Sequence, residues 1–150
     1  RPPCVYVSLR RATYTHGAIL ARGGYTISIP SERHAAEADY VGLVSGRDAD
    51  KFAVTGLTPV RAEHVDAPYV GEFPVVLEVK LLQAIELGSH TQFVGEVLDA
   101  KVDEDCLNAD GHPDLARVRP LVFATMATEY YGLGQRVGGA FEIGRAFAQR

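Results

Sequence analysis

Cysteine is scarce in this chain, and its two cysteines stand far apart. Cys4 lies in a segment with the alternating pattern of a strand, and Cys106 lies in a polar loop. This spacing fits neither a disulfide framework nor a C-x-x-C redox or zinc pair. We therefore expect both residues to be free thiols.

Basic clusters and long apolar runs are also absent. The 150 residues carry a net charge of −4 with an isoelectric point near 5.7, and Arg10-Arg11 is the only cluster of Lys or Arg. A nucleic-acid surface would need a basic patch, so we expect no nucleic-acid partner. No run approaches the roughly 20 apolar residues of a membrane helix, and no secretory leader opens the sequence. The sequence thus predicts a cytoplasmic protein that binds no membrane.

Several chemistries lack their characteristic motifs. The five histidines form neither H-E-x-x-H nor a paired ligand spacing, so we expect no metal site. Residues 103–114 alternate carboxylates as a calcium loop does, but their spacing differs and no bidentate glutamate closes the loop. Residues 132–138 place their third glycine one position too late for a dinucleotide loop. The chain also lacks a G-x-S-x-G nucleophile elbow, so this motif gives no indication of nucleophilic catalysis.

What is present is enough apolar sequence for one folded domain, with 47% hydrophobic and 23% charged residues. Alternating residues predict strands around Val5 and Val7 and over 25–29. A helix is predicted over 15–21, with Thr13 or Thr15 at its start. Two long runs over 74–87 and 91–102, joined by Gly88-Ser89, predict a large antiparallel hairpin. Two further helices are predicted, one over 33–44 capped by Ser31 and one over 48–54 ending at Gly56. The remaining predictions are short edge segments over 58–61 and 65–69, a strand over 119–124, a short aromatic segment over 130–134 and a weakly helical end over 139–150.

The opening strand runs directly into hydroxyl and guanidinium groups. Ser8, Arg10 and Arg11 are followed by Thr13 and Thr15, one of which stands where the helix would begin. Free amides at a helix start, hydroxyl donors and a bidentate arginine together bind a phosphate group. The alternative is an exposed turn whose threonine only caps the helix, because the glycine pattern of nucleotide loops is missing.

Four segments together resemble the flavin reductase-like family, in particular its flavoredoxin type. They are PPCVYVSLRRATYTH (2–16), SGRDADKF (45–52), EFP (72–74) and GSHTQFVGEV (88–97), and their order and spacing agree over nearly the whole chain. The resemblance implies a mainly β fold: an antiparallel, Greek-key split β-barrel of FMN-binding type with a few short peripheral helices. It also implies a homodimer that holds FMN non-covalently near the subunit interface.

The sequence begins without methionine, and Pro2-Pro3 leads straight into the first predicted strand. In the resembling family such a pair follows an earlier strand and a polar loop that touches the flavin. We therefore expect residues 1–150 to be a single flavin reductase-like domain that is N-terminally truncated and lacks its first strand. Because a missing strand would remove part of the cofactor site, a non-catalytic module that dimerises or binds a ligand without flavin is the alternative.

The resemblance also assigns side chains to the cofactor. In the family the histidine of this G-x-H motif lies beside the flavin, so His90 would tune the ring, unless it is an ordinary surface residue. Lys51 would face the cofactor or electron donor, or else pair with Asp48 on a helix surface. Phe123 would cover a flavin face or fill the core. The expected FMN contacts are Ser8, Leu9, Arg10, Thr13, Thr15, Lys51, His90 and Phe123.

The implied function is flavin redox chemistry in which the protein positions and tunes the cofactor. In enzymatic members NAD(P)H reduces the flavin, whereas flavoredoxin-like members pass electrons to a protein partner. The residues do not decide between an NAD(P)H:flavin oxidoreductase and a flavin electron carrier.

Overall fold

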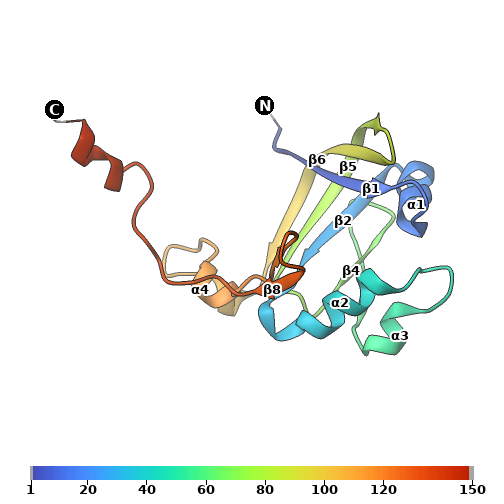
Figure 1. Ribbon diagram of the computed structural model, residues 1–150, viewed down its shortest axis with the longest axis horizontal. Coiled ribbons are helices and arrows are strands. Elements are labelled where there is room, and N and C mark those ends of the chain that lie inside the picture. Colours follow the sequence, from blue (N-terminus) through green and yellow to red (C-terminus); the bar gives the residue numbers. More distant parts are fainter. Residues whose placement is uncertain (1, 149–150) are drawn as a thin grey trace.

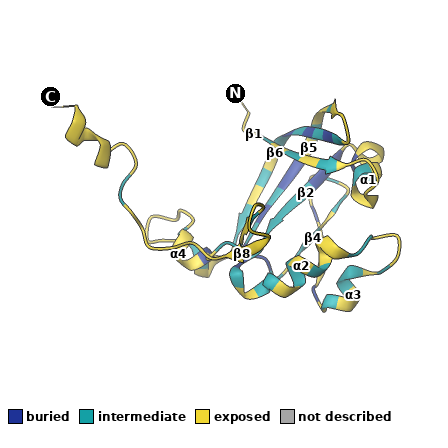
Figure 2. Ribbon diagram, in the orientation of Figure 1, coloured by how far each residue is buried: buried dark blue, intermediate teal, exposed yellow. Residues whose placement is uncertain are grey.

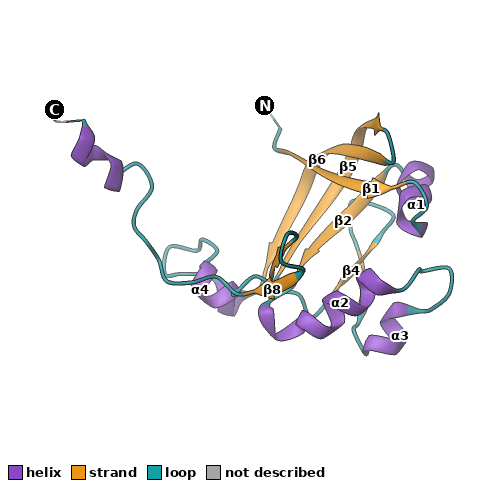
Figure 3. Cartoon of the chain, in the orientation of Figure 1, coloured by secondary structure: helices purple, strands orange, loops and turns teal. Residues whose placement is uncertain are grey.

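The computed structural model describes residues 2–148, and its centre is a four-stranded antiparallel sheet (Figure 1). The strand order is β1 (Cys4–Arg10), β6 (His90–Val102), β5 (Val75–Leu87) and β2 (Gly24–Ile29). The sheet curls, and β1 pairs with the end of β6 that lies next to the hairpin turn (Figure 3). A mainly β, antiparallel architecture with short peripheral helices was predicted, and the structure confirms it.

The β5–β6 hairpin is the longest element, as the two apolar runs predict. Its strands have 13 residues each and turn at Gly88, whose φ of 61° lies in the left-handed region that favours glycine. The register shifts between Glu78 and Val79 and again between Leu81 and Gln83. Such irregularities increase the local twist, which helps the sheet to curl.

The core lies between this sheet and the first helix, α1 (Tyr14–Arg22). Ile19 of α1 packs with Tyr25, Val79 and Phe93, each less than 5% exposed. The Tyr25 hydroxyl donates a hydrogen bond to the Phe93 carbonyl at 3.2 Å, so the phenol is satisfied inside the core. Figure 2 shows the buried residues gathered on the central strands.

Gly95 of β6 makes this packing possible because there is no room for a side chain. A Cβ at this position would lie 2.4 Å from a Val79 methyl carbon and 2.8 Å from the Lys80 carbonyl oxygen. Both distances are far below van der Waals contact. The sequence therefore needs glycine here for a close approach between β5 and β6.

Near the start of β5, away from the hairpin turn, lies a buried carboxylate that sequence periodicity does not predict. Glu78 is 0% exposed and accepts hydrogen bonds from the backbone N–H groups of Glu63 at 3.2 Å and His64 at 2.7 Å. The Lys101 ammonium lies 3.2 Å from Glu78 and also pairs with Asp99. Burial alone would raise the pKa of Glu78, but the two amides and Lys101 outweigh it and hold that pKa below its usual range. Glu78 thereby fastens the loop around residues 63–64 to the sheet.

The first helix, α1, agrees closely with its predicted bounds, whereas the others differ more from theirs. Thr13 caps α1 by accepting the His16 N–H, and α3 (Lys51–Thr55) ends at Gly56. The predicted helix over 33–44 is instead a 3-10 turn, η1 (Glu32–His34), followed by α2 (Ala35–Leu43). Ser31 makes no side-chain cap, so the prediction of a capping role for its hydroxyl was wrong.

The remaining elements are small and peripheral. They are the pair β3 (Pro59–Arg61) and β4 (Pro68–Val70), the pair β7 (Val122–Ala124) and β8 (Glu129–Tyr131), and η2 (Glu104–Cys106), α4 (Leu115–Val118) and η3 (Ile143–Phe147). Beyond β8 the chain extends away from the sheet and is largely exposed (Figure 2). Of the predicted C-terminal helix only the short turn η3 forms, and its last two residues lie outside the described part of the chain.

Candidate functional site

The polar residues singled out in the opening segment gather at the hairpin end of the sheet. In the β1–β6 register Arg10 lies opposite His90 and Ser8 lies opposite Gln92. Directly opposite residues of an antiparallel pair project from the same face, with Cβ atoms about 5 Å apart. Arg10 and Ser8 are exposed on that face, whereas Leu9 turns inward and packs against the core. We call the surface formed by Ser8, Arg10 and His90 the cradle; Thr15 lies next to it in sequence, at the start of α1, which packs against the other face of the sheet.

The structure distinguishes the two adjacent arginines. Arg11 pairs with Glu86 across the sheet edge. Arg10 has no ion pair or side-chain hydrogen bond with any residue between 2 and 148. The guanidinium available to an anion is therefore that of Arg10.

The two threonines also differ in what their hydroxyls do. The Thr13 hydroxyl donates to the Arg10 carbonyl at 2.9 Å and accepts the His16 N–H at 3.3 Å. It therefore fixes the turn between β1 and α1 and is occupied by the protein. Thr15 is exposed in the first turn of α1, and its hydroxyl makes no hydrogen bond within residues 2–148.

Sequence reasoning missed a hydrogen bond beneath the cradle. His16 Nε2 and Thr91 Oγ1 are 2.8 Å apart, and the His16 ring meets the edge of Phe93 with centroids at 5.1 Å. Thr91 is only 3% exposed, so this bond satisfies a buried hydroxyl. It joins the start of α1 to β6, which carries His90. Only the fold could reveal it, because the two residues are 75 positions apart.

The second family-like segment lies against the same end of the sheet. Arg47 donates to the Ala12 carbonyl at 2.7 Å, and Gly46 lies close to the Tyr14 ring. This contact brings a second guanidinium beside the β1–α1 turn. In the sequence, Arg47 stands out only because it belongs to the segment SGRDADKF. The resemblance assigned a cofactor contact in that segment to Lys51 and not to Arg47.

Three of the expected cofactor contacts do not present their side chains at the cradle. The Leu9 side chain is turned into the core, so only its backbone is available. Lys51 donates to the Val41 carbonyl at the end of α2, and burial lowers its pKa. Phe123 packs against Tyr130, and their strands β7 and β8 lie at the opposite end of the sheet from α1 (Figure 1).

His90 is half-buried at the first position of β6. Its Nδ1 and the Ser89 hydroxyl are 2.9 Å apart in a hydrogen bond. This bond leaves Nε2 as the ring nitrogen without a partner among residues 2–148, and such a nitrogen can donate to or accept from a ligand.

Ser8 and Arg10 of the cradle are exposed, and His90 is half-buried. Two cavities, of about 460 and 190 Å³, lie at the other end of the sheet. Within residues 2–148, no helix is long and apolar enough to cross a membrane, and no three potential ligand side chains gather to hold a metal ion. The cradle residues can bind an anion next to an imidazole group.

A curled antiparallel sheet with a few short helices is the architecture of the split-barrel flavoproteins. The sequence matches the Flavin reductase like domain over residues 1–132, and the chain belongs to that family. The structure resembles flavoredoxin of Desulfovibrio vulgaris (Miyazaki F) with a TM-score of 0.91 and 55% identity, covering 95% of this chain and 76% of that chain. This likeness confirms the split-barrel fold and the flavoredoxin-type resemblance.

Two curated relatives share less sequence. The chain is 30% identical over 146 residues to the high molecular weight rubredoxin of Moorella thermoacetica, covering 96% of this chain and 57% of the relative. It is 27% identical over 106 residues to the ferric-chelate reductase (NAD(P)H) of Archaeoglobus fulgidus, covering 70% of this chain and 62% of the relative. The chain thus spans a little more than half the length of these relatives. Its family associates it with flavin redox chemistry.

Proposed function

We propose that this chain binds FMN at the cradle and serves as a flavin redox protein of the flavoredoxin and flavin reductase type. The observation that carries the proposal is the position of Arg10, which has no protein partner within residues 2–148 and lies opposite His90. A free guanidinium suits the FMN phosphate, and an imidazole suits the polar edge of a flavin ring.

Each residue of the cradle and of the adjoining turn has a separate role in this proposal. Arg10 binds the phosphate bidentately, and the exposed Thr15 hydroxyl donates to it. Thr13 acts indirectly, because its hydroxyl holds the turn that presents Arg10 and the first amides of α1. Arg47, tied to the Ala12 carbonyl, adds positive charge beside the same turn. Ser8 supplies a further hydroxyl on the face that carries Arg10.

A bound flavin supplies the hydride and electron chemistry that side chains lack. His90 would donate a hydrogen bond from Nε2 to a bound flavin and so favour negative charge on its ring, while Ser89 keeps Nδ1 engaged. We assign Lys51 to joining α2 and α3, since it donates to the Val41 carbonyl.

The electron donor is NAD(P)H or a redox protein, and the relatives' names support both. One relative is named as an NAD(P)H ferric-chelate reductase, and the similar solved structure is a flavoredoxin. Rapid oxidation of NAD(P)H by the FMN-loaded chain would identify an enzyme. Slow oxidation combined with reversible reduction by a protein donor would identify a carrier.

We further propose that the protein is a cytoplasmic homodimer with FMN near the subunit interface. The exposed Ser8 and Arg10 support this arrangement, because a second subunit would enclose a flavin that one chain leaves exposed to water. Sedimentation of the FMN-loaded chain tests it, and a monomer at concentrations where FMN is bound would contradict it.

The deciding experiment is a titration of the chain with FMN and with riboflavin, followed by flavin fluorescence. Tight quenching by FMN and weaker binding of riboflavin is the expected result, because only FMN carries a phosphate. Equal affinities would contradict the cradle assignment. Absence of quenching with both ligands would favour the alternative of a non-catalytic split-barrel module.

A further inference from the structure

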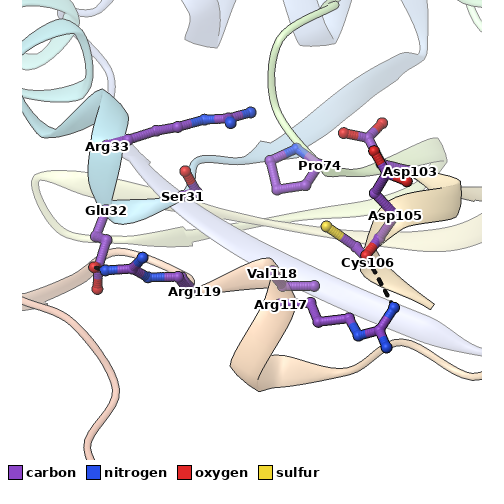
Figure 4. A pocket seen from close by; sticks show the side chains of 10 residues that line it. All are labelled: Ser31, Glu32, Arg33, Pro74, Asp103, Asp105, Cys106, Arg117, Val118 and Arg119. Carbon is purple, nitrogen blue, oxygen red and sulfur yellow. Dashed lines mark hydrogen bonds and ion pairs between the residues drawn. The ribbon is translucent and has the colours of Figure 1, made fainter. Parts of the chain in front are cut away.

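The larger cavity lies away from the cradle and has no part in the proposed flavin function. It measures about 460 Å³, within the range of small-molecule sites. Its walls come from η1 on one side and from η2 and α4 on the other (Figure 4). Guanidinium, carboxylate, hydroxyl and thiol groups line it together with the apolar side chains of Pro74 and Val118, so it offers polar partners to a charged ligand.

Ser31 presents a hydroxyl to this cavity. The residue is only 6% exposed, yet its Oγ makes no hydrogen bond with any residue in the described chain. The sequence favoured a helix cap at this position, and the structure shows that the hydroxyl does not cap. Because Ser31 lines the cavity and the protein does not use its hydroxyl, that hydroxyl is available to a ligand there.

Three of the six lining charges already have partners. Arg119 pairs with Glu32. Arg117 lies 3.5 Å from the Asp114 carboxylate and donates to the Asp105 carbonyl at 3.5 Å. These contacts account for two of the three arginines.

The charges that remain are divided between the two walls. Arg33 extends over the cavity from η1, and Asp103 and Asp105 stand on the opposite wall (Figure 4). Among residues 2–148, none of these three side chains forms an ion pair. One guanidinium therefore faces two carboxylates, and the complementary ligand has one negative and two positive groups.

We propose that this cavity binds a small zwitterion with one carboxylate and two ammonium groups, the chemistry of a basic amino acid. The ligand carboxylate accepts from the Arg33 guanidinium and the Ser31 hydroxyl. Its ammonium groups lie toward Asp103 and Asp105. Charge-assisted hydrogen bonds on both walls give the site its selectivity.

The test uses L-lysine as the probe and cadaverine as its matched control, because cadaverine is lysine without the carboxylate. Binding to the whole chain is measured by calorimetry and by backbone amide shifts. We expect lysine to bind at least tenfold more tightly than cadaverine, and Arg33→Gln or Ser31→Ala to remove most of that difference. Arg61→Gln makes the same change in charge on an exposed arginine of β3 and should leave lysine binding unaltered.

Cys106 lines the cavity and reports where the probe binds. In a Cys4→Ser background, saturating lysine should slow the alkylation of Cys106 several-fold, and cadaverine at the same concentration should not. Equal binding of the two probes, lysine binding that survives Arg33→Gln, or no binding of lysine would each overturn the proposal. FMN affinity is measured on the same samples, so that loss of folding is recognised separately from loss of the zwitterion site.

Discussion

Arg10 lies directly opposite His90 in the pairing of β1 with β6. The two residues are 80 positions apart in the chain, and only this antiparallel register brings them to one face of the sheet. Beneath them, His16 and Thr91 share a hydrogen bond on the core side. The candidate site thus consists of an outer pair on the face away from the core and an inner pair that keeps α1 against the sheet.

Replacing Arg10 with glutamine should weaken FMN binding by about tenfold or more, since charge-assisted hydrogen bonds to the phosphate are lost. Riboflavin affinity should stay unchanged, because riboflavin has no phosphate. Fluorescence titration with both ligands measures the effect. Arg11→Gln is the matched control, because that neighbouring guanidinium pairs with Glu86 instead. Equal losses in the two variants would contradict a specific phosphate contact.

Gly95→Ala should destabilise the chain by about 2–4 kcal/mol, because the new Cβ overlaps Val79 and the Lys80 carbonyl in a closely packed core. Chemical denaturation gives the free energy of unfolding. Gly17→Ala serves as the control, since a Cβ there meets nothing within 4 Å and alanine is the better helix former. We expect Gly17→Ala to be neutral or to stabilise by up to about 1 kcal/mol. Similar behaviour of both variants would argue against the close approach at Gly95.

Glu78 should make the protein less stable in acid. Its pKa in the folded state is below the ordinary value, so the unfolded chain binds more protons around that value. The stability that Glu78 contributes is therefore complete above its unfolded pKa and is lost as the pH falls through its lower folded pKa. Unfolding free energies measured from pH 7 down to about pH 3 should decrease with a slope that Glu78→Gln reduces.

The same substitution should also cost about 2–3 kcal/mol at pH 7, because it weakens the bonds to two backbone amides and leaves Lys101 with less compensation. Glu86→Gln provides the control, since the Glu86 side chain is 73% exposed. An unaltered pH slope in Glu78→Gln would show that other carboxylates cause the acid sensitivity.

His16 and Thr91 should be energetically coupled. In a double-mutant cycle with His16→Ala and Thr91→Val, we expect a coupling energy of about 1 kcal/mol in unfolding. The cycle separates the bond from the packing of His16 against Phe93, which either single substitution also disturbs. A coupling energy near zero would mean that the 2.8 Å contact adds nothing to stability.

The predicted elements that depend on local rules agree well with the structure. Thr13 caps α1, Gly88 turns the hairpin and Gly56 ends α3, because capping and positive φ angles are decided by neighbours in the chain. The helix over 33–44 was only partly right. There the backbone between Ser31 and Ala35 forms a 3-10 turn, and the Glu32 N–H bonds to the Arg119 carbonyl, a partner that local sequence does not reveal.

As with the fold, the sequence indicated part of the candidate site and left the rest to the tertiary structure. The residues around the β1–α1 turn could be selected because hydroxyl and guanidinium groups follow a strand directly. The separate duties of Arg10 and Arg11, and of Thr13 and Thr15, could not, because they depend on distant or three-dimensional partners such as Glu86. Glu78 was missed for the same reason: a charged residue in an alternating strand indicates an exposed position unless its partners are known.

By itself, the sequence determined the long hairpin, the capped helix after the first strand and the family, since alternation, capping and motif order are written along the chain. The tertiary structure alone decided which arginine remains free, which carboxylate is buried and which cavity faces Ser31. Those outcomes depend on hydrogen bonds and ion pairs between segments far apart in sequence. Such interactions become strong only once folding has brought the groups together and excluded water.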